Sequence, residues 1–207
     1  MKNYLTIIIL FFFVIGILIL TRCSEKKSYG NSTEEESLTT MNTNFNGFES
    51  QVAWGEHLVL IGSCHDCHTA KKMTSHGPVL DSTMWLAGHP ENMPRIDINR
   101  KEVEEKGLAV AMDLTEWVGP WGISFAANLT PDPTGLGNWS EEQFIYALRE
   151  GKSKGIPGAR TLLPPMPWEM IRNMTDDEMK AVFAYLKTIK PINNLVPAPV
   201  PPTSVTF

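Results

Sequence analysis

Two cysteines and a histidine lie close together in the segment Cys64-His65-Asp66-Cys67-His68. Thiols three residues apart in a turn at the end of a helix project from one side of the chain. From there they can bond to the two vinyl groups along one edge of a haem. The next residue, His68, then points its imidazole at the iron. The C-x-x-C-H spacing therefore predicts one haem held by Cys64 and Cys67, with His68 as an iron ligand.

Three other interpretations of this cysteine pair have less support. Half of a zinc site would need a second pair of cysteines or histidines at zinc spacing, and the sequence has none. A thioredoxin-like redox pair needs a surrounding βαβ pattern, which is not visible here. A structural disulfide with a bystander histidine is the third interpretation. The remaining cysteine, Cys23, stands apart, so the three cysteines cannot form a disulfide framework.

The elements expected to position the motif are helices, at residues 48–62, 140–149 and 175–190. The second and third begin with capping boxes, Ser140 with Gln143 and Thr175 with Glu178. Gly55 interrupts the apolar stripe of the first helix, which predicts a close crossing with the last helix at Phe183 or Leu186.

The long connection between these helices has no convincing strand pattern. Residues 70–135 are rich in loop-forming types, with one further helix expected near 100–112. The fold class expected is all-α, with an enlarged loop region between the haem-attachment motif and the last helix.

The chain divides by composition into four parts: an export signal or lipoprotein-type anchor at 1–23, a polar tether at 24–46, a globular domain at 47–190 and a Pro-rich tail at 191–207. Sixteen residues from Leu5 to Leu20 carry no charge. As a helix they would span about 24 Å, short of a bilayer core of roughly 30 Å. Cys23 stands where a lipoprotein signal would end, although Arg22 departs from the small residue expected there. An uncleaved anchor and a cleaved signal are the alternatives, and all three place the domain outside the cytoplasmic membrane, facing the periplasm or the cell exterior.

Charge and composition exclude other classes of protein. The chain has 18 basic and 23 acidic side chains and a formal charge of −5, so it lacks the basic footprint of a general nucleic-acid binder. With 43% hydrophobic residues it is neither a disordered tail nor a polytopic membrane protein.

Residues 47–200 resemble the class I cytochrome c family. The resemblance rests on the attachment motif, on Gly55 in the preceding helix and on three later segments: Gly77-Pro78-Val79-Leu80, Asn128-Leu129-Thr130-Pro131-Asp132 and Leu163-Pro164-Pro165-Met166-Pro167-Trp168. The last two, with residues 135–140, are similar to the cytochrome c modules of membrane-bound dehydrogenase subunits. Those subunits often carry two or three haems. The single motif here implies one haem c, covalently attached.

The resemblance also implies roles for individual residues. The carbonyl of Pro78 would accept a hydrogen bond from the Nδ1–H of His68 and so orient the imidazole. Met166 would be the sixth iron ligand, because it precedes the last helix and its proline neighbours stiffen the backbone. Two further candidates come from side-chain chemistry and not from the resemblance. Trp139 is more often a core aromatic, but a buried indole N–H needs a partner, for which a haem propionate is a candidate, and the same applies to Asn128.

The sequence leaves rivals for the sixth ligand. It contains ten methionines and five histidines, so Met166 competes with many side chains. His57 is expected on a partly exposed helix face, and His65 lies inside the attachment loop, where it cannot face the iron. His76 and His89 remain as serious alternatives.

An iron with histidine and methionine ligands has no open position for a substrate, which predicts an electron carrier rather than an enzyme. The expected partners are a dehydrogenase, a quinol-linked donor or a terminal oxidase, with the N-terminus on a membrane and no nucleic acid. One alternative is a haem enzyme or ligand sensor in which Met166 does not hold the iron. Another is a non-redox interaction module that uses the Pro-rich tail.

Overall fold

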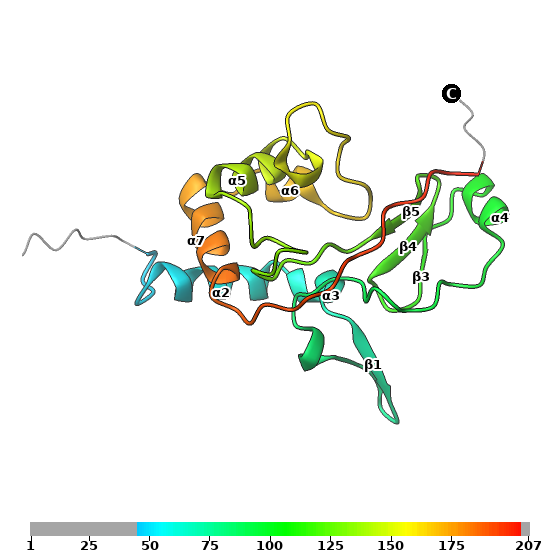
Figure 1. The fold of residues 1–207 in the computed structure, drawn as a ribbon, viewed down its shortest axis with the longest axis horizontal. Coiled ribbons are helices and arrows are strands. Elements are labelled where there is room, and N and C mark those ends of the chain that lie inside the picture. The colour runs from blue at the N-terminus through cyan, green and yellow to red at the C-terminus, as the bar shows by residue number, and fades with distance from the viewer. Residues whose placement is uncertain (1–44, 204–207) are drawn as a thin grey trace, which may run out of the picture. The chain divides into compact units, whose positions relative to one another are not determined.

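Two helices from distant parts of the chain cross closely in this computed structural model, which describes residues 45–203. Helix α2 spans Gln51–Ile61 and helix α7 spans Asp176–Leu186, and Figure 1 shows α7 crossing α2. A Cβ atom built on Gly55 would lie 1.9 Å from the carbonyl oxygen of Ala181 and 2.9 Å from Cβ of Tyr185. The predicted crossing at Gly55 is confirmed, but its partners are Ala181 and Tyr185 rather than Phe183 or Leu186.

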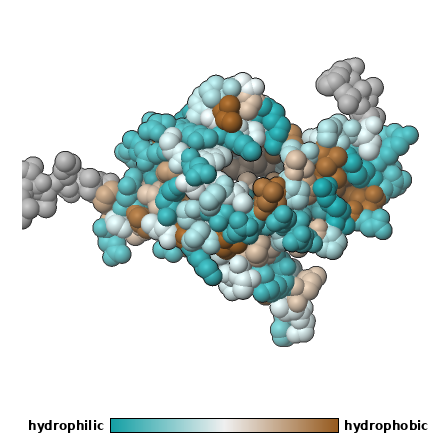
Figure 2. Space-filling view, in the orientation of Figure 1, coloured by the Kyte–Doolittle hydropathy of each residue, from teal (hydrophilic) through white to brown (hydrophobic). Residues whose placement is uncertain are grey.

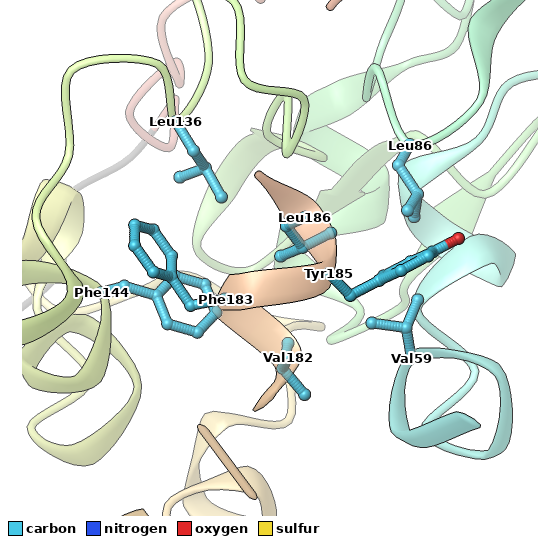
Figure 3. Close-up of a cluster of buried hydrophobic side chains, with 8 residues drawn as sticks. All are labelled: Val59, Leu86, Leu136, Phe144, Val182, Phe183, Tyr185 and Leu186. Carbon is cyan, nitrogen blue, oxygen red and sulfur yellow. The ribbon is translucent and has the colours of Figure 1, made fainter. Parts of the chain in front are cut away.

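The main hydrophobic core lies around α7. Figure 3 shows its eight buried side chains: Val59, Leu86, Leu136, Phe144, Val182, Phe183, Tyr185 and Leu186. The rings of Phe144 and Phe183 are 5.1 Å apart between centroids, so α5 (Glu141–Arg149) is held against α7 by an aromatic contact. Cys64 packs against the edge of the same cluster. The haem-attachment motif is therefore fixed directly to the core.

Both helices have their predicted N-cap residue, but only one of the two predicted capping boxes is complete. At the start of α5 the Ser140 hydroxyl accepts the amide hydrogen of Gln143, whereas the Gln143 side chain donates to the Lys154 carbonyl. At the start of α7, Thr175 and Glu178 each bond the other's backbone N–H, which completes a capping box. Shorter helical segments are α3 (Cys64–His68), α4 (Arg100–Glu105) and α6 (Trp168–Ile171), with 3-10 turns at Ser82–Met84 and Ser153–Gly155.

The expectation of an all-α fold is wrong, because the long connection contains two antiparallel sheets. Strands β1 (Lys71–Thr74) and β2 (Gly77–Leu80) form a hairpin that projects from the rest of the fold in Figure 1. Strands β3 (Val110–Ala111), β4 (Glu116–Gly119) and β5 (Gly122–Phe125) form a second sheet in that order. Helix makes up about 33% and strand about 13% of the residues that the structure describes, so the fold is mixed α and β. Strands of two to four residues are too short to show an alternating pattern in the sequence.

The C-terminal segment packs along the domain. Val200 forms a backbone bridge with Ile123 of β5, and the Thr203 amide donates to Glu104 of α4 at 2.6 Å. Asn194 is buried and donates to the carbonyls of Ala87 and His89. Residues 191–203, seen in red crossing Figure 1, therefore form a strap that belongs to the same compact unit as the helices.

Within residues 45–203, no helix combines the length and the apolar character needed to cross a membrane. The predicted anchor at Leu5–Leu20, Cys23 and nearly all of the predicted tether lie outside the described residues.

Candidate functional site

The attachment motif forms a helix of its own. Helix α3 consists of Cys64–His68 and begins after Ser63, whose left-handed backbone (φ 55°) turns the chain sharply out of α2. Cys64 and Cys67 are both free thiols, so they are not joined to each other in a disulfide. Because they are three residues apart on one helix, their side chains share a face.

Burial keeps both thiols protonated. It raises the pKa of Cys64 to about 11, and burial also raises the pKa of Cys67. A structural zinc site needs further ligands beside these two cysteines, and no group of three or more metal-binding side chains occurs in the part of the chain that the structure describes. The thiols therefore fit attachment to a haem and not a zinc site.

The protein fixes the tautomer of His68. Its ring is buried, and Nδ1 lies 2.7 Å from the carbonyl oxygen of Ala127. A carbonyl can only accept, so Nδ1 carries the hydrogen and Nε2 keeps its lone pair. Burial, the main cause, lowers the pKa of His68 and favours the neutral ring. His68 thus presents a neutral imidazole nitrogen suited to iron.

The acceptor for His68 is Ala127 and not Pro78. Pro78 lies on the exposed strand β2, where it pairs with Met73. After His68 the chain first runs out along the β1–β2 hairpin, so Pro78 is carried away from the imidazole. The backbone returns to His68 only later, at Gly88 and at Ala127.

Gly88 allows this return. Its amide donates to the carbonyl of His68 at 2.8 Å, and its φ of 78° favours glycine. A Cβ atom at this position would lie 2.4 Å from the carbonyl oxygen of Ala126 and 2.6 Å from that of Ala127. The absence of a side chain at Gly88 therefore lets the Ala126–Ala127 backbone approach His68.

The two rival histidines for the sixth ligand are poorly placed. His76 is exposed at the turn of the β1–β2 hairpin. His89 is fully buried, with Nδ1 2.8 Å from the Thr115 hydroxyl and Nε2 enclosed by protein atoms without a partner. His65 is likewise buried: its Nδ1 lies 2.9 Å from the Thr69 hydroxyl and its Nε2 is enclosed.

Met166 lies on a proline-rich loop between Leu162 and Trp168. Its side chain is half-buried and borders a hollow of about 280 Å³, with Pro164 and Trp168 among its neighbours there. Two contacts tie this loop to the domain. The Leu162 amide donates to the Gly151 carbonyl at 2.7 Å, and the Ser124 hydroxyl donates to the Pro164 carbonyl at 2.6 Å.

Asn128 and Trp139 serve the fold in this structure. The Asn128 amide donates to the Ile192 carbonyl at 2.9 Å and its oxygen accepts the Thr130 amide at 2.9 Å, so both polar ends already have partners. Trp139 packs against the main core. A haem contact by either residue remains a prediction.

Sequence reasoning missed Ala127, Gly88 and Ser124. Ala127 contributes only its backbone, and a serine in a strand carries no signal. Gly88 offered a clue, since a glycine outside a helix often marks a close approach or a positive φ.

Two partly buried thiols and a histidine fixed in one tautomer define a c-type haem attachment site. The sequence profile of the Cytochrome c family matches residues 52–190. The chain belongs to that family, whose members carry covalently bound haem c.

Similar proteins include cytochrome subunits of dehydrogenases. The fructose dehydrogenase cytochrome subunit of Gluconobacter japonicus is 39% identical over 158 residues, which cover 75% of this chain and 24% of that protein. The cytochrome c subunit of a quinone alcohol dehydrogenase from Gluconobacter oxydans is 39% identical over 146 residues, 70% of this chain and 23% of that protein. A nicotinate dehydrogenase protein of Pseudomonas putida is 41% identical over 80 residues, 38% of this chain and 6% of that protein. The chain thus spans about a quarter of these relatives' length or less.

Proposed function

We propose that this protein is a membrane-tethered, single-haem electron carrier on the outer side of the cytoplasmic membrane, with His68 and Met166 as the two axial ligands of the iron. The observation that carries the proposal is that one short backbone segment bonds both to the loop of Met166 and to the ring of His68. Within residues 124–127, the Ser124 hydroxyl holds the loop of Met166 and the Ala127 carbonyl holds the ring of His68. Three residues of extended chain span about 10 Å at most, so the two attachment points stay close.

The chain's own residues each have a part in this function. Haem c supplies a one-electron iron couple when bound. Cys64 and Cys67 would attach it, and Cys64 packs against the edge of the core, so the attachment point is fixed to the fold. Ala127 keeps the His68 nitrogen oriented and raises its basicity, which favours the oxidised iron, while a thioether ligand favours the reduced iron.

The proposed donor or acceptor is a dehydrogenase subunit, with a quinol-linked donor or terminal oxidase at the other end of the transfer. The names of the relatives support this choice, since the fructose and alcohol dehydrogenase proteins are cytochrome subunits. On the face shown in Figure 2, hydrophobic residues form small separate patches among hydrophilic ones. Such a surface suits short-lived docking better than a permanent interface.

Membrane attachment is tested by changing Cys23 to Ser. If Cys23 is lipidated, the variant should release the domain or accumulate as an uncleaved precursor. If Leu5–Leu20 is itself the anchor, size and membrane location should stay unchanged. Haem-loaded protein with an intact N-terminus in the cytosolic fraction would contradict both forms of the proposal.

The alternative, a haem enzyme or ligand sensor, differs from a carrier in one property. In a carrier the methionine sulfur occupies the sixth position, so the oxidised protein shows a sulfur-to-iron charge-transfer absorption and the reduced protein resists carbon monoxide. Absence of that absorption, together with ready binding of carbon monoxide, would favour the alternative.

A further inference from the structure

The loop that carries Met166 cannot hold itself in place. Three of its five residues from Leu163 to Pro167 are prolines, which have no backbone N–H to donate. Two residues of the five, Leu163 and Met166, keep a backbone N–H. The Met166 amide bonds only within the loop, to the Leu163 carbonyl at 3.3 Å. The loop therefore depends on hydrogen bonds that reach it from other elements.

One such bond comes from the sheet that the sequence did not predict. Ser124 lies on β5, is buried with 7% of its surface exposed, and its hydroxyl donates to the Pro164 carbonyl at 2.6 Å. The same hydroxyl oxygen accepts the indole Nε1–H of Trp121 at 3.1 Å. Because the indole can only donate, it directs the serine hydrogen toward Pro164.

The sheet holds this pair of side chains rigidly. Ser124 is paired with Trp117 on β4, and Trp121 lies in the β4–β5 turn with its ring over Gly119. A Cβ atom on Gly119 would lie 2.5 Å from that ring, so the indole is closely packed against the turn. Neither the Ser124 hydroxyl nor the Trp121 indole can therefore move without disturbing the β4–β5 hairpin.

We propose that Ser124, aimed by Trp121, is a positioning residue that keeps Met166 on the iron by restraining the Pro164 carbonyl two residues before it. The inference rests on Met166 being the sixth ligand. It gives the β4–β5 hairpin a role in holding both iron ligands. Strand β5 restrains the Met166 loop through Ser124, and the segment after β5 restrains His68 through Ala127.

The loss of the Ser124 hydroxyl can be measured through the competition between Met166 and an external ligand for the iron. Without the Ser124 hydroxyl the loop opens more often, and an external ligand such as imidazole gains access to the oxidised iron. A loss of about 1.4 kcal/mol in loop closure corresponds to about tenfold tighter apparent binding of imidazole.

The test uses the full haem-loaded protein and three variants. Ser124→Ala should keep the haem attached, weaken the sulfur-to-iron absorption and bind imidazole about tenfold more tightly, whereas Ser124→Thr, which keeps the hydroxyl, should behave like the parent. Thr188→Ala is the matched control, because the Thr188 hydroxyl also donates to a backbone carbonyl, that of Tyr185 at 2.7 Å, at the end of α7. The control should lose stability without a change in imidazole affinity.

The outcomes separate this inference from the proposed function. If the parent protein has no sulfur-to-iron absorption, Met166 is not the ligand and both proposals fail. If the parent shows that absorption but Ser124→Ala binds imidazole no more tightly than Thr188→Ala, the positioning role of Ser124 fails, while Met166 can still be the sixth ligand. Should Ser124→Ala not accumulate, Trp121→Phe keeps an aromatic ring and removes only the donor. It should raise imidazole affinity in the same direction, and an unchanged affinity would overturn the role.

Discussion

Replacing Gly88 by alanine tests how the protein positions His68, the proposed proximal ligand of the iron. The added Cβ would lie 2.4 Å from the Ala126 oxygen and 2.6 Å from the Ala127 oxygen. Ordinary contact begins near 3.5 Å, so the backbone there must shift by about 1 Å. The acceptor of the His68 hydrogen bond is one of the displaced atoms. A shift of that size would stretch a 2.7 Å bond beyond useful length.

The expected cost has two parts. A side chain at φ of 78° costs about 1–2 kcal/mol, and overpacking against backbone costs about 1–3 kcal/mol. Gly158→Ala is the matched control, because Gly158 has a φ of 80° with nothing within 4 Å of the added atom. Gly88→Ala should therefore destabilise the protein by about 1–3 kcal/mol more than Gly158→Ala.

The assay combines urea unfolding with redox titration of the haem-loaded variants. Losing the bond to Ala127 makes His68 a weaker donor to the iron, so the reduction potential of Gly88→Ala should rise while that of Gly158→Ala stays at the parent value. Equal losses of stability and equal potentials in the two variants would refute the proximal role given to Gly88.

Three further predictions concern the fold around the site. Gly55→Leu should cost several kcal/mol and reduce the yield of haem-loaded protein, because its Cβ alone would lie 1.9 Å from Ala181; a parent-like urea midpoint would contradict the close crossing. Thr175→Ala should cost about 1 kcal/mol through loss of the α7 cap, measured by the same unfolding curves, and no change would mean that the cap is not needed. Although burial alone would raise the pKa of Glu104, hydrogen bonds from Thr203 and Arg100 lower it. The stability that the Glu104 carboxylate contributes is therefore present at neutral pH and lost as the pH falls through the lowered pKa. Glu104→Gln should be destabilising at pH 7 and nearly neutral in acid, and a cost independent of pH would contradict this role of the carboxylate.

The attachment motif and the helices were predictable because their signals are local. Three residues define the motif, and the capping box of Thr175 and Glu178 lies within one turn. Gly55 revealed the helix crossing, since a glycine in an apolar stripe needs a packing reason. Only its contact residues on α7 were misplaced, by one or two positions along the helix.

The sheets and the acceptor of His68 could not be predicted from local patterns. Strands β4 and β5 have four residues each and are stabilised by pairing and by the strap at Val200, 75 or more residues further along the chain. Ala127 acts through its carbonyl, a group that every residue possesses. Such contacts depend on the path of the backbone, which the residue types alone do not specify.

The most direct test of the central claim is the comparison of Met166→Ala with Met170→Ala. Met170 lies four residues further along and is 71% exposed, so its loss should leave the iron unaffected. Met166→Ala should keep the haem attached, lose the sulfur-to-iron absorption, lower the reduction potential and bind carbon monoxide in the reduced form, while Met170→Ala keeps the parent spectrum. A parent-like spectrum and potential in Met166→Ala would show that another residue is the sixth ligand and that the proposed His68–Met166 site is wrong.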